Sequence, residues 1–174
     1  IAFYNLKTGF VMSTDSNQFS SWADNLIKLN FNIFKYYEQI KFIAGSYFYT
    51  TFIVLISLTK VIFGFQWQNA LFTLNLISLL LSLIIFSKCL LIIGVRPLII
   101  SFSMPLLIIS VDLLTWPKFI LTDMIFSFLV MLAIFIVIRG VIEKKILYLS
   151  LALTLFIIFI TRPTSIPIIF AILF

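Results

Sequence analysis

The pattern of hydrophobic and polar positions divides the chain into a short amphipathic part and a longer hydrophobic part. In the amphipathic part, apolar residues recur at the i, i+3, i+4, i+7 and i+8 positions of a helix. These residues are Phe19, Trp22, Ala23, Leu26 and Ile27. Polar residues occupy the opposite face. This helix is too polar to span a bilayer, and its two-sided character predicts that it lies in the plane of the membrane interface.

The hydrophobic part contains several segments that are long and apolar enough to span a bilayer. The predicted spans are 67–87, 97–116, 124–138 and 146–160. In the first of these, Asn75, Ser78 and Ser82 form a polar stripe, which favours helix–helix contact over a substrate path. Segment 42–63 is also long enough to span, but it carries polar residues near one helical face. Hydropathy leaves open whether it crosses the membrane or lies along its surface.

Composition strengthens this interpretation. The chain is 63% hydrophobic and 10% charged, with a mean hydropathy of +1.22, far more apolar than an ordinary soluble domain. The fold class predicted is all-α: a polytopic membrane helical bundle with one or two juxtamembrane surface helices in the first outer loop. The chain begins with Ile1 and ends inside a hydrophobic run, so we expect it to be a fragment of a longer protein.

The domain organisation that follows is a single transmembrane module over residues 1–174. Residues 1–10 are predicted to end a first membrane helix, 11–66 to form the first outer loop with its surface helices, and 67–174 to form membrane helices.

Charge and residue types exclude several classes of chemistry within this segment. The chain has no histidine, which removes a Ser-His-Asp triad and nearly all common zinc sites. Its single cysteine, Cys89, cannot form a disulfide within the chain. The net charge of +6 comes from basic residues scattered singly or in one pair, as in membrane loops, so no nucleic-acid partner is predicted.

Two acids are the candidate chemical groups. Asp123 follows Pro117 and precedes an uncharged run, so it is predicted near the start of a membrane helix, where the backbone dipole favours negative charge. Asp15 precedes the amphipathic helix, and with Gln18 it resembles a capping box. Each acid also has a purely structural explanation: Asp15 as a helix N-cap, and Asp123 as a partner of the helix dipole.

The basic segments 88–96 and 139–145 are predicted to lie on one side of the membrane, because two spans separate them. The positive-inside rule makes that side cytoplasmic and puts Asp123 and Arg162 on the outer side. The side of Asp15 depends on segment 42–63. If that segment spans, the two acids are on opposite faces; if it lies flat or re-enters, they share one face.

Four motifs in this order resemble the GT-C membrane glycosyltransferases. Asp15-Ser16 before an amphipathic helix is similar to the start of their first outer loop, and the segment ending Phe63-Gly64 is similar to their surface helices. Leu121-Thr122-Asp123 resembles the "Leu-Thr-acid" element that opens a later helix. Thr161-Arg162-Pro163 is similar to a stretch often written Leu-Thr-Arg-Pro. Some members have a second acid where this chain has Ser16, and Asp112 has no counterpart in the family pattern.

The resemblance, which points to enzymes such as aminoarabinose transferases and protein O-mannosyltransferases, implies a function and roles for residues. A sugar would move from a polyprenyl-phosphate donor to a lipid, glycan or protein acceptor on the outer face. Asp15 would be the catalytic base, and Asp123 would orient the acceptor or, with Asp15, hold a divalent ion (Mg²⁺ or Mn²⁺) where a member uses one. Arg162 or Lys118 would offset the charge on the leaving phosphate. The bacterial inner membrane is favoured over the endoplasmic reticulum.

Two other functions are open at this point. In a transporter or flippase, Asp15, Asp112 and Asp123 would line a proton or substrate path. The chain would otherwise be a non-catalytic membrane subunit, with Arg162 as an interface anchor. A transporter is expected to carry acids in mid-span positions and broken helices. The acids here cluster near predicted helix ends, which favours an enzyme working at the membrane surface.

Overall fold

The computed structural model describes residues 12–40, 46–109, 115–119, 121–144 and 147–173. The regular elements in these residues are helices, which confirms the predicted all-α class. The α-helices are α2 (Thr14–Lys28), α3 (Ile33–Ile40), α4 (Thr50–Phe63), α5 (Trp67–Ile92), α6 (Pro97–Ile109), α8 (Asp123–Ile142), α9 (Tyr148–Phe159) and α10 (Ser165–Leu173). Short 3-10 helices lie at Ser46–Tyr49 (η1), Gly64–Gln66 (η2) and Trp116–Lys118 (η3). The predicted membrane helix end at 1–10 lies outside the described residues.

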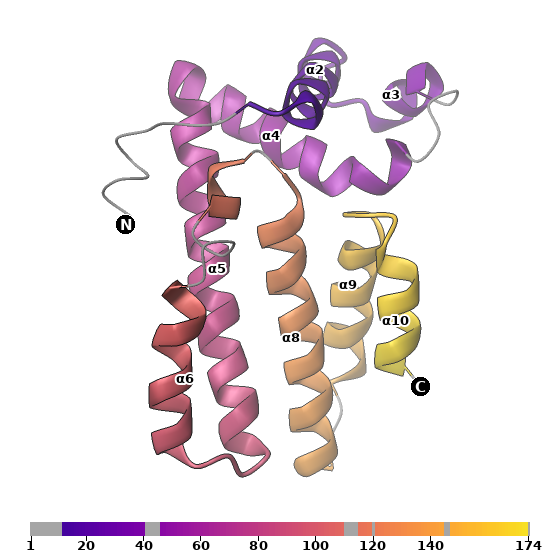
Figure 1. Cartoon of the computed structure of the whole chain (residues 1–174). Coiled ribbons are helices and arrows are strands. Elements are labelled where there is room, and N and C mark those ends of the chain that lie inside the picture. The colour runs from indigo at the N-terminus through magenta and orange to yellow at the C-terminus, as the bar shows by residue number, and fades with distance from the viewer. Residues whose placement is uncertain (1–11, 41–45, 110–114, 120, 145–146, 174) are drawn as a thin grey trace.

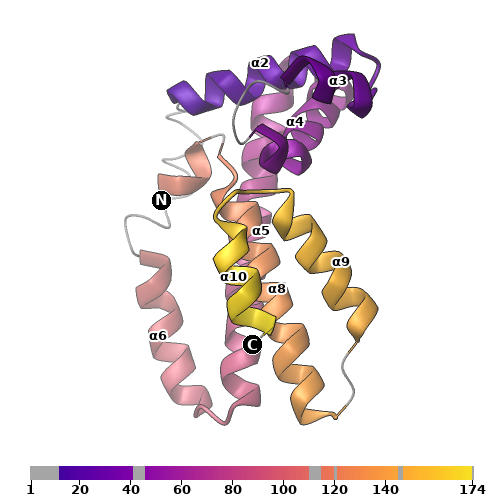
Figure 2. The same ribbon diagram turned by 90° about the vertical axis from the view of Figure 1, so that its right-hand side faces the viewer.

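The helices form two layers. Helices α5, α6, α8, α9 and α10 stand side by side as a bundle, and α2, α3 and α4 lie across one end of it (Figures 1 and 2). We call α2, α3 and α4 the cap layer. Its core is made of buried residues from all three helices and from the first turns of α5: Phe19, Trp22, Ala23, Leu26, Tyr36, Ile40, Phe52, Ile53, Ile56 and Leu71. Burial, with a smaller contribution from Tyr37, raises the pKa of the Tyr36 hydroxyl well above its usual range, so this group is protonated.

The corner between the cap layer and the bundle is made at Gly64. Helix α4 ends there with φ +54° and ψ −126°, a conformation that side-chain-bearing residues rarely adopt. The chain then turns through η2 into α5. Segment 42–63, whose orientation the sequence left open, therefore contains a helix, α4, that lies across the end of the bundle rather than along it (Figure 1).

The bundle is built around the pair α5 and α8, which has the most extensive contact in the described chain. The predicted polar stripe of α5 lies inside the protein: Asn75, Ser78 and Ser82 are all buried. On the other side of α8 a second apolar cluster forms with α9, and it contains Phe126, Leu129, Ala133, Leu151, Leu155 and Ile158. Ile125 packs against both this cluster and the core of the cap layer.

Helix lengths correct some of the expected boundaries. Two helical stretches are long and apolar enough to cross a membrane: Tyr47–Ile92, which joins the cap layer to α5, and Asp123–Ile142. The apolar helices α6 and α9 are shorter, at 13 and 12 residues. At 1.5 Å per residue α9 does not reach the roughly 30 Å of a hydrocarbon core, and the residues that follow Ile109 of α6 lie outside the described part of the chain. Helix α5 continues to Ile92, so Lys88 and Cys89 lie in a helix and not in the loop predicted at 88–96.

Candidate functional site

Asp123 is the first residue of α8, as the sequence predicts. Its carboxylate lies in the first turn, where the unpaired backbone N–H groups and the helix dipole favour a negative charge. The preceding residue, Thr122, makes no side-chain hydrogen bond to this turn. The Asp123 side chain is 24% exposed, so the acid is accessible without being fully solvated.

Arg162 lies in the turn between α9 and α10 and forms an ion pair with Asp123, in which its Nη1 donates to Oδ1. The two residues are 39 positions apart in the sequence. The guanidinium carbon also lies 5.9 Å from the centre of the Phe126 ring, one turn along α8. Two of the predicted site residues are thus brought together, and Arg162 contacts two residues of the first turn of α8.

The cap layer holds the turn that carries Arg162. The backbone N–H of Thr51, in the first turn of α4, donates to the carbonyl of Ile160 at 3.2 Å. Beside it, the rings of Phe48 and Phe159 pack edge to face with their centres 5.4 Å apart. The position of the Arg162 turn therefore depends on α4 as well as on the bundle.

Helix α5 holds the segment that leads to Asp123. The Nδ2 group of Asn75 donates to the carbonyl of Phe119 at 3.2 Å and to that of Pro117 at 3.4 Å. Lys118 lies between these two carbonyls at the end of η3 and is half-buried. Because Asn75 is fully buried, its donors are satisfied by this segment and not by water.

Asp15 lies in the first turn of α2 and is exposed. It is not the N-cap that the capping-box pattern suggested: Ser13 is the cap, and its Oγ accepts the N–H of Ser16 at 3.1 Å. The start of α2 lies against the start of α5, because Gln68 Nε2 contacts Met12 Sδ at 3.9 Å. Asp15 is therefore at the same end of the bundle as Asp123 (Figure 1).

The structure does not join all the candidates into one cluster. Among the described residues, no hydrogen bond or ion pair links Asp15 to Asp123 or Arg162. Asp112 lies outside the described residues. The expectation of a divalent ion also finds no support in the donor set: Arg162 places a positive charge on the Asp123 carboxylate, which opposes a cation. No three acidic, cysteine or histidine side chains gather in the described chain. The described candidates, Asp15 and the Asp123–Arg162 pair, therefore do not form a set of ligands for a divalent ion.

Lys60 is an important residue that the sequence pattern did not reveal. Its ammonium donates to the carbonyl and hydroxyl of Ser20 at 3.0 and 2.8 Å and to Asp24 at 2.7 Å. It also lies 4.7 Å from the centre of the Trp67 ring. This side chain is only 12% exposed and ties α4 to α2. A single lysine in an apolar run, with an acid on the polar face of a nearby helix, is the signal that could have found it.

No family model, no curated protein and no solved structure matches this chain. The chemistry of the site is therefore inferred from its own residues: one exposed carboxylate, one carboxylate paired to an arginine, and a layer of helices above the end of a hydrophobic bundle.

Proposed function

We propose that this chain is a catalytic part of a GT-C-type glycosyltransferase, which moves a sugar from a polyprenyl-phosphate donor to an acceptor on the outer face of a membrane. The ion pair between Asp123 and Arg162 is the observation that carries the proposal. It joins the Leu-Thr-acid element to the Thr-Arg-Pro element, so two motifs that carry the resemblance meet in space although they are 39 residues apart.

In this proposal the bundle is a polytopic membrane module. Helices α5 and α8 cross the bilayer, and the cap layer lies at the outer interface. Phe34 and Phe65, which are 84% and 92% exposed, would insert into the headgroup boundary. The opposite end of the bundle carries the basic residues Lys88, Arg96, Arg139 and Lys144 and would face the cytoplasm.

The residues suit transfer from a lipid phosphate. The departing phosphate is stable as an anion, so no general acid is required, and one carboxylate suffices to accept the proton of the acceptor hydroxyl. Asp15 fits this role because it is exposed and is not needed as a helix cap. The general base and the leaving-group stabiliser would then come from different layers of the protein.

Arg162 would stabilise the charge on the leaving phosphate. A guanidinium has five N–H donors in a rigid fork, so the bond to Asp123 leaves donors for a second anion. Asp123 would act as a positioning residue that fixes the guanidinium. Lys118 would supply a second cation for the same phosphate. Preorganised donors of this kind stabilise charge that develops in a transition state.

The test compares Asp15→Asn with Asp24→Asn in membranes that hold equal amounts of full-length protein. Both residues are exposed acids of α2, so the pair controls for charge and helix effects. Loss of a positioned general base is expected to lower transfer by about 10²–10⁴-fold, with donor binding retained. Asp24→Asn is expected to change transfer by less than about fivefold, even if its half-exposed pair with Lys60, worth at most about 1 kcal/mol, were felt in full at the site. Full activity of Asp15→Asn would refute Asp15 as the base.

Topology is tested separately. Single cysteines at Asn17, Lys118 and Lys144 are introduced into a Cys89→Ser background and exposed to an impermeant thiol reagent. We expect labelling of the first two from the outer face and of Lys144→Cys only after the membrane is opened. Labelling of Asn17→Cys from the cytoplasm would place the cap layer on the wrong side.

A further inference from the structure

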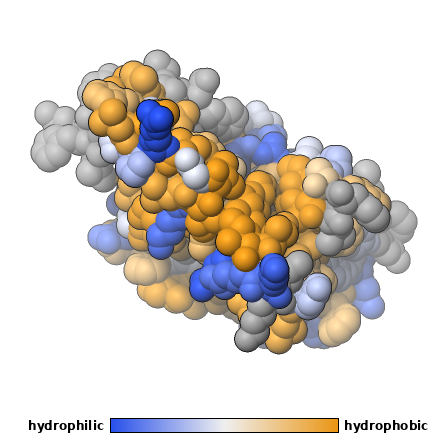
Figure 3. Space-filling model, turned by 90° about the horizontal axis from the view of Figure 1, so that it is seen from below, coloured by the Kyte–Doolittle hydropathy of each residue, from blue (hydrophilic) through white to orange (hydrophobic). Residues whose placement is uncertain are grey.

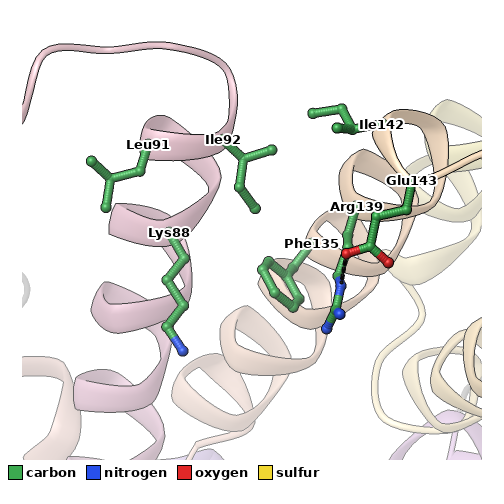
Figure 4. A pocket seen from close by; sticks show the side chains of 7 residues that line it. All are labelled: Lys88, Leu91, Ile92, Phe135, Arg139, Ile142 and Glu143. Carbon is green, nitrogen blue, oxygen red and sulfur yellow. Dashed lines mark hydrogen bonds and ion pairs between the residues drawn. The ribbon is translucent and has the colours of Figure 1, made fainter.

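A second site candidate lies at the end of the bundle remote from Asp123. A pocket of 340 Å³ opens between the last turns of α5 and α8 (Figure 4). Its apolar lining consists of Leu91, Ile92, Phe135 and Ile142. Three of these side chains are exposed, at 48% for Leu91, 36% for Ile92 and 55% for Ile142, so the pocket is open at the surface of the bundle.

The other lining residues are charged: the cations Lys88 from α5 and Arg139 from α8, and the acid Glu143 directly after α8. Figure 4 shows the Phe135 ring between the two cations. Within the described chain Lys88 has no hydrogen-bond or ion-pair partner. Arg139 uses only its Nε–H, which donates to Glu143 Oε1 at 2.7 Å. The terminal N–H groups of the guanidinium therefore have no partner among the described residues, and the pocket offers two sources of unused donors.

We propose that this pocket binds an anionic phospholipid of the surrounding bilayer. In a membrane, an apolar pocket that is open at the surface of the bundle can hold an acyl chain, and cationic groups in its lining favour an anionic headgroup. Lys88 and Arg139 would bind the phosphate and the apolar lining would hold one chain. Basic pockets between membrane helices on the cytoplasmic side are suited to such headgroups.

Charge around the pocket supports an anionic occupant. Among the described residues, the ends of α5 and α8 and the turns after them hold four basic residues (Lys88, Arg96, Arg139 and Lys144) and one acid, Glu143. Seen from this end, hydrophilic residues gather in separate groups on a mainly hydrophobic surface (Figure 3). Glu143 also lines the pocket, and its negative charge lowers the net positive charge there. Replacing Glu143 with a neutral residue should therefore raise the affinity for an anionic lipid.

The experiment measures lipid binding to the purified full-length protein by native mass spectrometry, with phosphatidylglycerol and phosphatidylcholine of the same acyl chains as probes. Lys88→Gln and Arg139→Gln are each expected to weaken phosphatidylglycerol binding about fivefold, and the double variant about 25-fold. Arg96→Gln is the matched control, because Arg96 is an exposed cation at the same end that does not line the pocket. Glu143→Gln is expected to tighten binding, a change that damage to the fold would not produce.

The possible results distinguish a phospholipid site from a site for a soluble phosphate. Preference for phosphatidylglycerol over phosphatidylcholine that disappears in the double variant and persists in Arg96→Gln supports the site. Equal binding of the two lipids by the unaltered protein overturns it. Binding of soluble glycerol phosphate as tight as that of phosphatidylglycerol also overturns it, because the acyl chain would then contribute nothing. None of these measurements depends on sugar transfer, so the lipid site and the proposed function can fail independently.

Discussion

The two ends of the bundle differ in how their charges are used. At the end covered by the cap layer, Lys60 pairs with Asp24 over 36 residues of sequence and Arg162 pairs with Asp123 over 39. At the basic end, the ion pair in the described residues is Arg139–Glu143, which joins neighbouring turns of one helix. A pair between distant segments fixes how helices sit against each other, whereas a pair within a helix supports only that helix.

The burial of these charged side chains also differs between the two ends of the bundle. The Lys60 and Arg162 side chains are 12% and 32% exposed, and that of Arg139 is 54% exposed. Charges that are shielded from water and tied to two elements hold a fixed geometry, as the proposed binding of the leaving phosphate would require. Exposed charged side chains on one helix keep their conformational freedom, and this freedom suits contact with a mobile lipid headgroup. The paired charges at the end covered by the cap layer are therefore held in position, whereas those at the basic end can adjust to what they bind.

Among the variants that compare the two ends, the largest effect is expected for Arg162→Gln. If the Asp123–Arg162 pair stabilises the leaving phosphate, transfer should fall by about 10²–10³-fold, as when one preorganised donor to a transition state is removed. Transfer is measured as consumption of the lipid-linked sugar in membranes with matched protein levels. Arg139→Gln serves as the control from the basic end and should keep transfer near the unaltered rate. Equal losses of transfer in both variants would show that the two ends of the bundle contribute to transfer alike.

An intermediate effect is expected for Lys60→Met, which keeps the apolar stem and removes the ammonium. The carbonyl and hydroxyl of Ser20 and the Asp24 carboxylate lose their donor, and the free energy of unfolding should fall by about 1–3 kcal/mol. Thermal unfolding of the detergent-solubilised protein measures the loss, and proteolysis within α2 should become faster. In a double-mutant cycle with Asp24→Asn, the coupling should be near 1 kcal/mol, because Asp24 is half-exposed. Slower proteolysis or a coupling of zero would show that Lys60 does not tie α4 to α2.

The smallest effect is expected at the basic end. Arg139→Gln and Glu143→Gln should each change the free energy of unfolding by less than about 0.5 kcal/mol, because both side chains are more than half exposed and the pair spans one turn. The same thermal measurement, at low and high salt, checks this. A loss above 1 kcal/mol that persists in high salt would give the pair a role comparable to that of Lys60.

Much of the local structure follows from the sequence. The spacing of Phe19, Trp22, Ala23, Leu26 and Ile27 predicts the apolar face of α2; the first four are buried and Ile27 is half-buried. The uncharged run after Asp123 predicts α8, which begins at that residue. The stripe of Asn75, Ser78 and Ser82 predicts an inward face of α5. These features depend on side-chain periodicity and on helix-end chemistry, which neighbouring residues determine.

Helix ends were predicted less well. Ser13, and not Asp15, caps α2, since either residue satisfies the composition rule and only backbone geometry selects one. Helix α5 runs beyond Ser87 to Ile92 because nothing in the intervening residues stops it before Gly94, where φ is +90°. The number of membrane spans is still a prediction, since two helical stretches in the described residues meet the length and composition test.

By itself, the sequence determined the all-helical class, the amphipathic character of α2, and the two acids and one arginine worth testing. Only the tertiary structure decided that α4 lies across the bundle, because an apolar run of that length is compatible with either orientation and the corner at Gly64 resolves it. Only the tertiary structure paired Asp123 with Arg162 and Asp24 with Lys60. Such pairs form where distant helices pack, and packing depends on the shape of the whole core, which local periodicity does not encode.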